Sequence, residues 1–216
     1  MKIIKPNYEI IDNIDGQAIL KKIEYCARVS HKSEDRITET SAAPFVKKII
    51  ELGDESVLEH VSVTVKFICD RGVSHELVRH RLASFTQEST RYCNYSKDGF
   101  GHEITVIQPP FGTDILGIAR AEAWRHEMKA AEKAYFQLLE AGAKPEEARS
   151  VLPNSLKTEV IMTANLREWR HVLSLRADRR AHPQMRELMI PLLYELQEKI
   201  PVVFDDIAER IREQNK

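Results

Sequence analysis

We predict from the sequence an α+β fold in which a mostly antiparallel sheet is packed with long helices. Long segments repeat apolar residues at helical spacing. Residues 61–69 instead alternate apolar residues with mostly polar ones, as a strand with one buried face does. No internal repeat, low-complexity tract or linker-like stretch divides the 216 residues. One domain over residues 1–216 is therefore the simplest interpretation.

Two helices are predicted before that strand. Residues 15–29 carry apolar residues at helical spacing behind Asp15, which can cap the first turn. Residues 43–52 show a second helical pattern, which Gly53 ends. After the strand, residues 73–83 are predicted as a helix that ends in an arginine-rich segment.

The second half of the chain is predicted to be mainly helical. A short strand is expected at residues 103–108, inside loops at residues 92–112 that contain several glycines and prolines. Residues 157–164 fit either a strand or a turn of buried helix, and the pattern does not separate the two. The remaining apolar patterns are helical, and they cover residues 113–141, a short segment after Pro145, residues 166–175 and a last long segment from Pro183.

The composition is that of a globular protein without a bulk charge. Hydrophobic residues make up 43% of the chain, and 32 Lys and Arg nearly balance 33 Asp and Glu, for a net charge of −1. Proteins that bind nucleic acid through bulk electrostatics are usually far more basic. We therefore expect no nucleic-acid partner, and any anion must be bound by a local cluster of arginines.

The cysteines and the start of the sequence indicate a reducing compartment. Three cysteines at wide spacing suggest neither a disulfide framework nor a zinc knuckle. We find no signal-peptide pattern at the start and no apolar run long enough to cross a bilayer. We therefore expect a cytoplasmic protein with no membrane partner.

The stretch with the most chemistry lies between Arg79 and Tyr92. It reads Arg-His-Arg-Leu-Ala-Ser-Phe-Thr-Gln-Glu-Ser-Thr-Arg-Tyr and combines three arginines and a histidine with hydroxyl and amide groups. Guanidinium groups match phosphate oxygens bidentately. Leu82, Ala83 and Phe85 can anchor the stretch to the core. On the residues alone, a surface helix end with scattered arginines explains the stretch equally well.

The same stretch resembles the signature of the flavin-dependent thymidylate synthases. The pattern Arg-His-Arg-x-x-Ser-x-x-x-x-Ser-x-Arg has six fixed positions, and residues 79–91 match all six. Further blocks resemble other elements of that family at similar spacing, and they are Gly53–His60, Glu147–Pro153, Asn165–Arg167 and Leu175–Asp178. The resemblance covers most of the chain, from about residue 25 to about residue 200.

The resemblance implies an enzyme that methylates dUMP to dTMP, with FAD as cofactor and with NADPH and methylenetetrahydrofolate as co-substrates. At the matching positions, the residues that would contact FAD are Ser56, Arg79, His80, Arg81, Gln87, Asn165, Leu166, Arg167 and His171. Those that would contact dUMP are Glu76, Leu77, Val78, Arg79, Gln87, Glu88, Ser89, Thr90, Arg91, Arg149 and Arg176. The family's sites are shared between subunits of a homotetramer, so the resemblance also implies self-association.

Three positions depart from the family pattern. Asp54 stands where histidine is common, and His171 stands where asparagine is common. The run His182-Pro183-Gln184 replaces the usual Gln-x-Glu after Arg176. The departure at Asp54 bears on a cofactor contact there, and none of the three departures touches the six-position signature.

Other kinds of catalytic site find little support in the residues. The only Gly-x-Gly, at residues 99–101, lacks the third glycine of a dinucleotide-binding turn, so side chains would have to hold the pyrophosphate of FAD. Ser89 has His80 nearby in the sequence, but no carboxylate clearly orients that histidine, and Cys93 is explained as a small buried residue. His75 and His80 are spaced wrongly for a His-Glu-x-x-His motif, so we expect no metal.

Arg149 and Arg176 are each flanked by apolar residues. Alone, they would be explained as partners in interhelix salt bridges, but the family blocks around them favour ligand binding. We expect Arg176 to be catalytic. A guanidinium beside N3 of uracil and the adjacent carbonyl would stabilise negative charge in the ring, and so activate C5 for attack.

Two alternatives remain. A nucleotide- or RNA-binding module could use the arginines without chemistry and stack Phe85, Tyr92 and Tyr95 on bases. A catalytically inactive relative could bind flavin only. A flavin enzyme should be yellow, or turn yellow on addition of FAD, which separates both flavin-binding hypotheses from the RNA-binding one.

Overall fold

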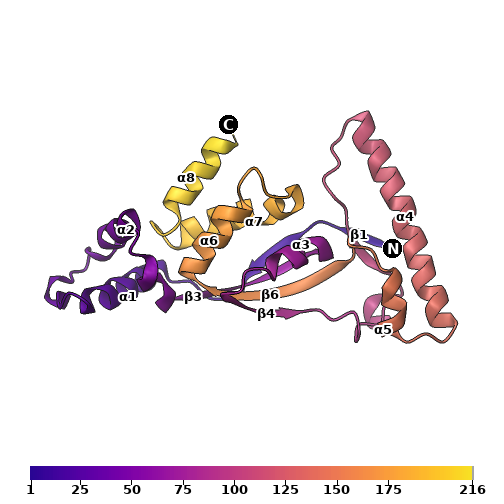
Figure 1. The fold of residues 1–216 in the computed structure, drawn as a ribbon, viewed down its shortest axis with the longest axis horizontal. Coiled ribbons are helices and arrows are strands. Elements are labelled where there is room, and N and C mark those ends of the chain that lie inside the picture. Colours follow the sequence, from indigo (N-terminus) through magenta and orange to yellow (C-terminus); the bar gives the residue numbers. More distant parts are fainter. Residues whose placement is uncertain (216) are drawn as a thin grey trace. The chain divides into compact units, whose positions relative to one another are not determined.

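The structure of the chain is a computed structural model that describes residues 1–215 (Figure 1). The chain forms two compact units, each made of three segments. The first unit consists of Met1–Asn7, Phe67–Arg79 and Thr86–Ile161, and the second unit consists of Tyr8–Lys66, His80–Phe85 and Met162–Lys216. Helices and a small antiparallel sheet are both present, so the predicted α+β class is confirmed.

The helices of the second unit follow the predicted apolar patterns. Helix α1 (Gly16–Val29) begins behind Asp15, whose carboxylate accepts the backbone N–H of Ala18 at 3.0 Å. Helix α2 (Ala42–Leu52) ends at Gly53, whose φ of 78° favours a residue without a Cβ. The unit also contains η1 (Glu34–Arg36), η2 (Glu55–His60), α6 (Leu166–Arg176), α7 (Pro183–Lys199) and α8 (Asp205–Gln214). Helix α8 has no counterpart among the predicted helices.

The first unit is built around the long helix that the sequence predicts at residues 113–141. This helix, α4 (Ile115–Glu140), packs its buried Met128 and Tyr135 against Tyr95, Val106 and Leu156. The other helical segments of the unit are α3 (Arg71–Leu77), η3 (Asp98–Phe100), α5 (Pro145–Ala148) and η4 (Arg149–Val151). Helix α5 confirms the short helix expected after Pro145.

The strands form a four-stranded antiparallel sheet and a parallel pair. The larger sheet has the order β2-β3-β6-β4, with bounds Asn7–Ile10, Ser62–Asp70, Lys157–Asn165 and Ala83–Gln87. Burial alternates along β3 and β6, as the predicted strand at residues 61–69 requires. Strand β6 resolves the open choice at residues 157–164 in favour of a strand. The parallel pair joins β1 (Lys2–Ile4) to β5 (Thr105–Ile107).

The predicted helix at residues 73–83 is wrong in both its start and its end. Helix α3 begins at Arg71 because the side chain of Asp70 accepts the backbone N–H of Val73 at 2.7 Å. It ends at Leu77, and β4 begins at Ala83. Residues 78–82 form a turn and a loop instead, and only Ala83 of the predicted helix lies in β4, which pairs with β6.

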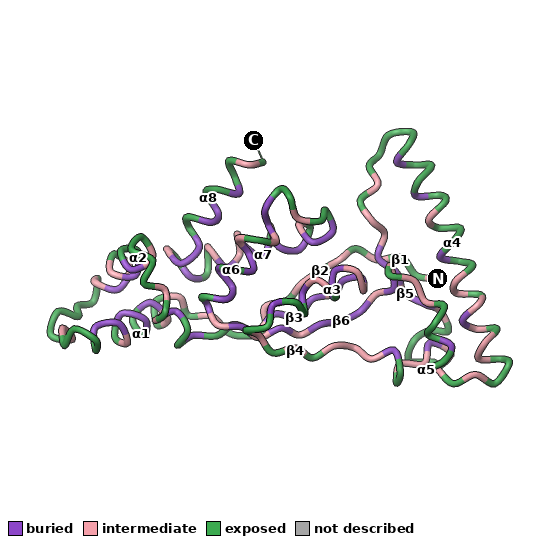
Figure 2. Tube along the Cα trace, in the orientation of Figure 1, coloured by how far each residue is buried: buried purple, intermediate pink, exposed green. Residues whose placement is uncertain are grey.

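The core of the second unit is densest along α6 and α7, where buried positions run in long stretches (Figure 2). Trp169 of α6 has no exposed surface, and its indole N–H donates to the carbonyl of Val63 at 2.9 Å. This bond fixes α6 to β3 within the unit. Among the residues described, no helix is both long enough and apolar enough to span a membrane.

Candidate active site

A polar cleft in the second unit contains several of the residues expected to contact FAD. Its volume is about 870 Å³, and Asn165, Arg167 and His171 line it. Ligand pockets commonly enclose about 300–1,000 Å³, so the cleft is large enough for a dinucleotide-sized group. Leu82 also lines it and is 75% exposed, and its neighbour Arg81 is exposed as well.

Helix α6 presents most of these residues because of how it starts. Asn165 ends β6, and its side-chain oxygen accepts the backbone N–H of Glu168 at 2.9 Å. This cap satisfies one of the open N–H groups of the first turn. Arg167 and His171 lie one turn apart on the face opposite the buried Trp169, which places both at the cleft.

The cleft is held in shape by Arg170, a residue that the sequence analysis does not identify. Its guanidinium contacts Glu55 of η2 at 2.9 Å and Asp206 of α8 at 2.8 Å, and it also donates to the carbonyl of Val203. Arg170 is buried. Because an arginine satisfied by three partners is costly to disturb, we interpret it as structural.

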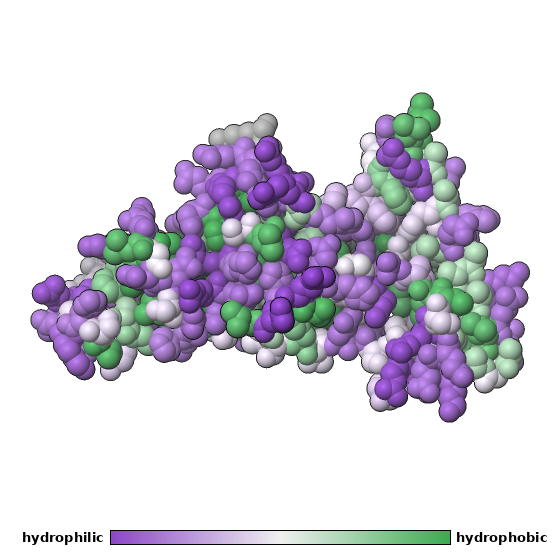
Figure 3. All heavy atoms as spheres, viewed as in Figure 1, coloured by the Kyte–Doolittle hydropathy of each residue, from purple (hydrophilic) through white to green (hydrophobic). Residues whose placement is uncertain are grey.

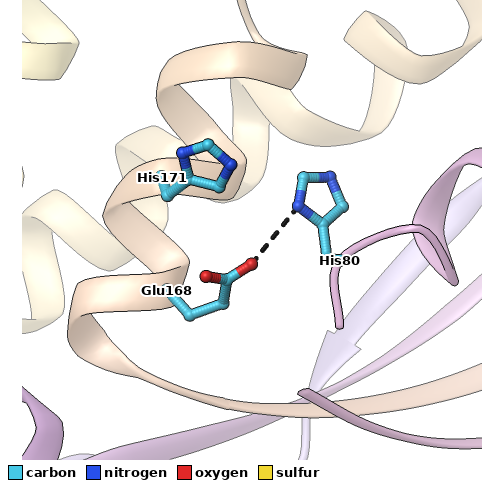
Figure 4. A group of neighbouring side chains, drawn as sticks. All are labelled: His80, Glu168 and His171. Atoms are coloured by element: carbon cyan, nitrogen blue, oxygen red, sulfur yellow. Dashed lines mark ion pairs between the residues drawn. The ribbon is translucent and has the colours of Figure 1, made fainter. Parts of the chain in front are cut away.

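His80, from the arginine-rich stretch, is buried and lies between two residues of α6. Its Nδ1 is 3.3 Å from a carboxylate oxygen of Glu168, as Figure 4 shows, and its Nε2 is 3.0 Å from Nε of Arg176. The ring of His171 stands edge-on to the His80 ring, with 5.7 Å between centroids. Burial, then the positive charge of Arg176 and of His171, lowers the pKa of His80 to about 4. His80 is therefore neutral at pH 7.

The same three side chains, His80, Glu168 and His171, are close enough to hold a metal ion, with ligand atoms within 4.8 Å of one another. The surroundings do not suit a cation. A metal-bound histidine normally donates a hydrogen bond from its second nitrogen, but the second nitrogen of His80 faces the N–H of Arg176. The positive guanidinium of Arg176 also lies next to the His80 ring and would repel a cation. The arrangement fits a hydrogen-bonded chain better than a metal centre.

In the first unit, the structure brings together two blocks that the sequence places far apart. Arg149, at the start of η4, donates to the hydroxyl of Thr90 at 3.3 Å. Arg91 is 3.5 Å from Glu146 of α5, and its backbone N–H donates to the hydroxyl of Ser89 at 3.3 Å. Two arginines and two hydroxyls thus gather around one turn, which suits a phosphate.

Gln87 and Glu88 are fixed beside that turn by β6. The amide nitrogen of Gln87 donates to the hydroxyls of Ser74 at 3.0 Å and Thr158 at 3.2 Å. Glu88 forms an ion pair with Lys157 at 2.9 Å. With its nitrogen bound in this way, the oxygen of the Gln87 amide is the group that can accept from a ligand.

The other expected site residues are more scattered. Ser56 is exposed on η2, and Arg79 is exposed after α3. Glu76 lies in α3 and Val78 follows it. Leu77 and Leu166 have no exposed surface.

By unit, the expected residues separate into two groups. All those expected to contact dUMP belong to the first unit except Arg176. All those expected to contact FAD belong to the second unit except Arg79 and Gln87.

The structure also bears on the other hypotheses. Tyr95 is 5% exposed and packs edge-on against Phe100 and Tyr135, so its ring cannot stack on a base as the RNA-binding hypothesis requires. Burial and then the nearby Glu88 raise the pKa of Cys93, which keeps the thiol protonated and unsuited to nucleophilic attack. Glu168 orients His80, which the sequence could not show because the two are far apart in the chain.

Comparison with known proteins identifies relatives over most of the chain. The family model described as "Thymidylate synthase complementing protein" matches residues 10–202. A protein of Geobacter sulfurreducens named flavin-dependent thymidylate synthase is 33% identical over 190 residues, covering 88% of this chain and 79% of its own. A protein of Pyrococcus furiosus with the same name is 34% identical over 191 residues, covering 88% and 75%.

A solved structure shares the fold. It is the crystal structure of a UMP/dUMP methylase, PolB, from Streptomyces cacaoi bound with 5-Br UMP. The TM-score is 0.78 at 20% sequence identity, covering 97% of this chain and 96% of that one. At this identity the likeness shows the fold, and the family rests on the sequence matches. The chain belongs to the flavin-dependent thymidylate synthase family, a family of methyltransferase enzymes.

Proposed function

We propose that this chain methylates dUMP to dTMP, with FAD as cofactor, methylenetetrahydrofolate as carbon donor and NADPH as reductant. The observation that carries the proposal is the match of residues 79–91 to all six positions of the family signature, in a chain that belongs to that family. The fold neighbour named a UMP/dUMP methylase, with a uridine nucleotide analogue bound, supports a nucleotide substrate.

FAD would occupy the cleft of the second unit. Arg167, which also pairs with Glu59 at 2.6 Å, and Asn165 lie at the N-terminal end of α6, where helix N–H groups favour the negative charge of a dinucleotide. Arg79 and Arg81 would add donors, with Ser56, His80, Gln87, Leu166 and His171 as further contacts. When bound, FAD would supply the hydride needed to complete the methyl group.

dUMP would bind through the turn of the first unit. Arg91, Arg149 and the hydroxyls of Ser89 and Thr90 would hold its phosphate. Gln87 would face the nucleotide with its amide oxygen, while Glu76 to Arg79, Glu88 and Arg176 would complete the contacts.

Arg176 would activate the pyrimidine. Its guanidinium would donate to N3 and the flanking carbonyl of uracil and stabilise the ring in its N3-ionised form, whose negative charge makes C5 nucleophilic toward the carbon donor. Because the neutral bound substrate does not carry this charge and the activated ring does, the contact would act mainly on turnover.

We further propose a homotetramer with shared sites. Apolar side chains gather where α4 begins (Figure 3), and there Ile115, Leu116 and Ile118 are 85%, 61% and 54% exposed. Exposed apolar clusters of this kind commonly mark protein interfaces. Sharing would also allow Arg176 and the dUMP-binding turn of one site to come from different subunits.

Arg149→Ala is expected to weaken dUMP binding about 10- to 150-fold, since a charged hydrogen bond contributes about 1.5–3 kcal/mol. FAD affinity should stay unchanged because no FAD contact is assigned to Arg149. Titration calorimetry with each ligand measures both. Arg120→Ala, an exposed arginine of α4, is the control and should bind both ligands normally. A wild type that binds neither FAD nor dUMP would contradict the proposed function.

Arg176→Ala should lower turnover on the order of 10²- to 10³-fold, as loss of one oxyanion donor does. Arg176→Lys should recover little, because an ammonium cannot make the paired contact. The measurement is single-turnover methylation at saturating dUMP, with dUMP affinity determined separately. Normal saturated turnover with reduced affinity would make Arg176 a binding residue only.

Mixing two inactive variants should restore part of the activity if different subunits supply Arg79 and Arg176 to one site. The variants are Arg79→Ala and Arg176→Ala, exchanged under conditions where light scattering confirms subunit mixing. Each variant alone, treated identically, is the control. Absence of recovery despite proven exchange contradicts sharing between these two residues, and a stable active monomer contradicts the oligomer.

A further inference from the structure

His80 connects two residues of the same helix. Glu168 and Arg176 both lie on α6, about two turns apart. The His80 ring enters from the preceding arginine-rich stretch and contacts both, Glu168 through Nδ1 at 3.3 Å and Arg176 through Nε2 at 3.0 Å. His80 is 5% exposed and Glu168 is 7% exposed. Because water has little access, these two contacts decide which nitrogen of the imidazole carries the proton.

The donors and acceptors in the series Glu168–His80–Arg176 follow from the chemistry of the carboxylate and the guanidinium at its two ends. A guanidinium only donates hydrogen bonds, so Nε2 of His80 must be the acceptor from Arg176. The proton of a neutral imidazole then sits on Nδ1, where it faces the carboxylate of Glu168, which only accepts when ionised. A doubly protonated ring would turn an N–H toward the N–H of Arg176. Burial and the neighbouring Arg176 and His171 hold the pKa of His80 near 4, which agrees with a neutral ring.

We propose that Glu168 and His80 are positioning residues for Arg176. Glu168 holds the imidazole in the tautomer whose Nε2 accepts the Nε–H of Arg176, and this bond fixes the plane of the guanidinium. The consequence for turnover rests on the proposed function of Arg176, whereas the tautomer itself does not.

Fixing the plane matters because a guanidinium binds a flat ring productively only when the two are aligned. Arginine has several rotatable bonds, and a contact at Nε removes rotation at the end of the side chain. A misplacement of about 1 Å can cost about 100-fold in rate. Loss of either positioning residue should therefore lower saturated turnover more than it lowers ligand affinity.

The first experiment reads the tautomer directly in the wild-type chain. Nitrogen NMR of protein labelled with ¹⁵N-histidine, in the FAD-loaded state, should show His80 with a protonated Nδ1 and an unprotonated Nε2 from pH 7 down to about pH 5. His80→Gln identifies the signals. His171→Asn removes the neighbouring ring, which is not part of the hydrogen-bonded series Glu168–His80–Arg176, and should leave the tautomer of His80 unchanged. A proton on Nε2, or a charged His80 at pH 7, would overturn the proposal.

The second experiment tests whether Glu168 acts through Arg176. Glu168→Leu should lower single-turnover methylation at saturating dUMP about 10- to 100-fold, with FAD and dUMP affinities within a few-fold of wild type. Glu168→Gln keeps an oxygen that can accept from Nδ1–H and should recover most of the rate. It also serves where the leucine variant fails to fold.

A double-mutant cycle completes the test. In an Arg176→Ala background, Glu168→Leu should cause little further loss, because the residue it positions is already gone. An equal loss in both backgrounds would overturn the proposal. If the wild type makes no dTMP at all, the proposed function fails. The tautomer measurement still decides whether the hydrogen bonds from Glu168 through His80 to Arg176 exist.

Discussion

The bond between the indole N–H of Trp169 and the carbonyl of Val63 fixes helix α6 to strand β3, and the candidate site depends on that attachment. Trp169, Val172 and Leu173 are fully buried, so the core side of α6 cannot turn without exposing them. The opposite side then presents Arg167 and His171 to the cleft. Asn165 completes the arrangement, because its cap sets the residue at which α6 begins. A strand, a cap and one buried tryptophan thus determine where the charged residues of the helix lie.

The charged residues of α6 divide into structural and ligand-facing groups. Arg170 is satisfied by Glu55, Asp206 and the carbonyl of Val203, which ties α6 to η2 and α8. Such a buried network contributes more to a defined geometry than to net stability. A cofactor that is held by side chains, without a glycine-rich turn, needs donors whose positions do not relax. We interpret the Arg170 network and the hydrogen-bonded series from Glu168 to Arg176 as two arrangements that keep such donors in place.

Apolar residues at strand spacing or at helical spacing predict most of the fold. This works because each of these elements buries one of its own faces: α1, α2, α4, α6 and β3. Most of the elements that these patterns do not predict depend on contacts between residues far apart in the sequence. The sequence analysis predicts no strand at β4, which depends on pairing with the distant β6, and the three-residue β1 depends on a partner about a hundred residues away. Helix α8 does bury Ile207, Ala208 and Ile211 at helical spacing, so its signal was present. Similarly, the signature at residues 79–91 indicates the site, but only contacts between distant segments show that Glu168 orients His80 or that Arg149 meets Thr90.

We propose that this chain transfers a one-carbon unit to dUMP and reduces it to a methyl group with a flavin. The most direct measurement supplies the purified chain with FAD, dUMP, NADPH and methylenetetrahydrofolate labelled in its methylene carbon, and then analyses the nucleotide products by mass spectrometry. We expect dTMP that carries the label in its C5 methyl group, and no product when either FAD or the folate is left out. Unlabelled dTMP, or no dTMP from a protein that demonstrably binds FAD and dUMP, would contradict it.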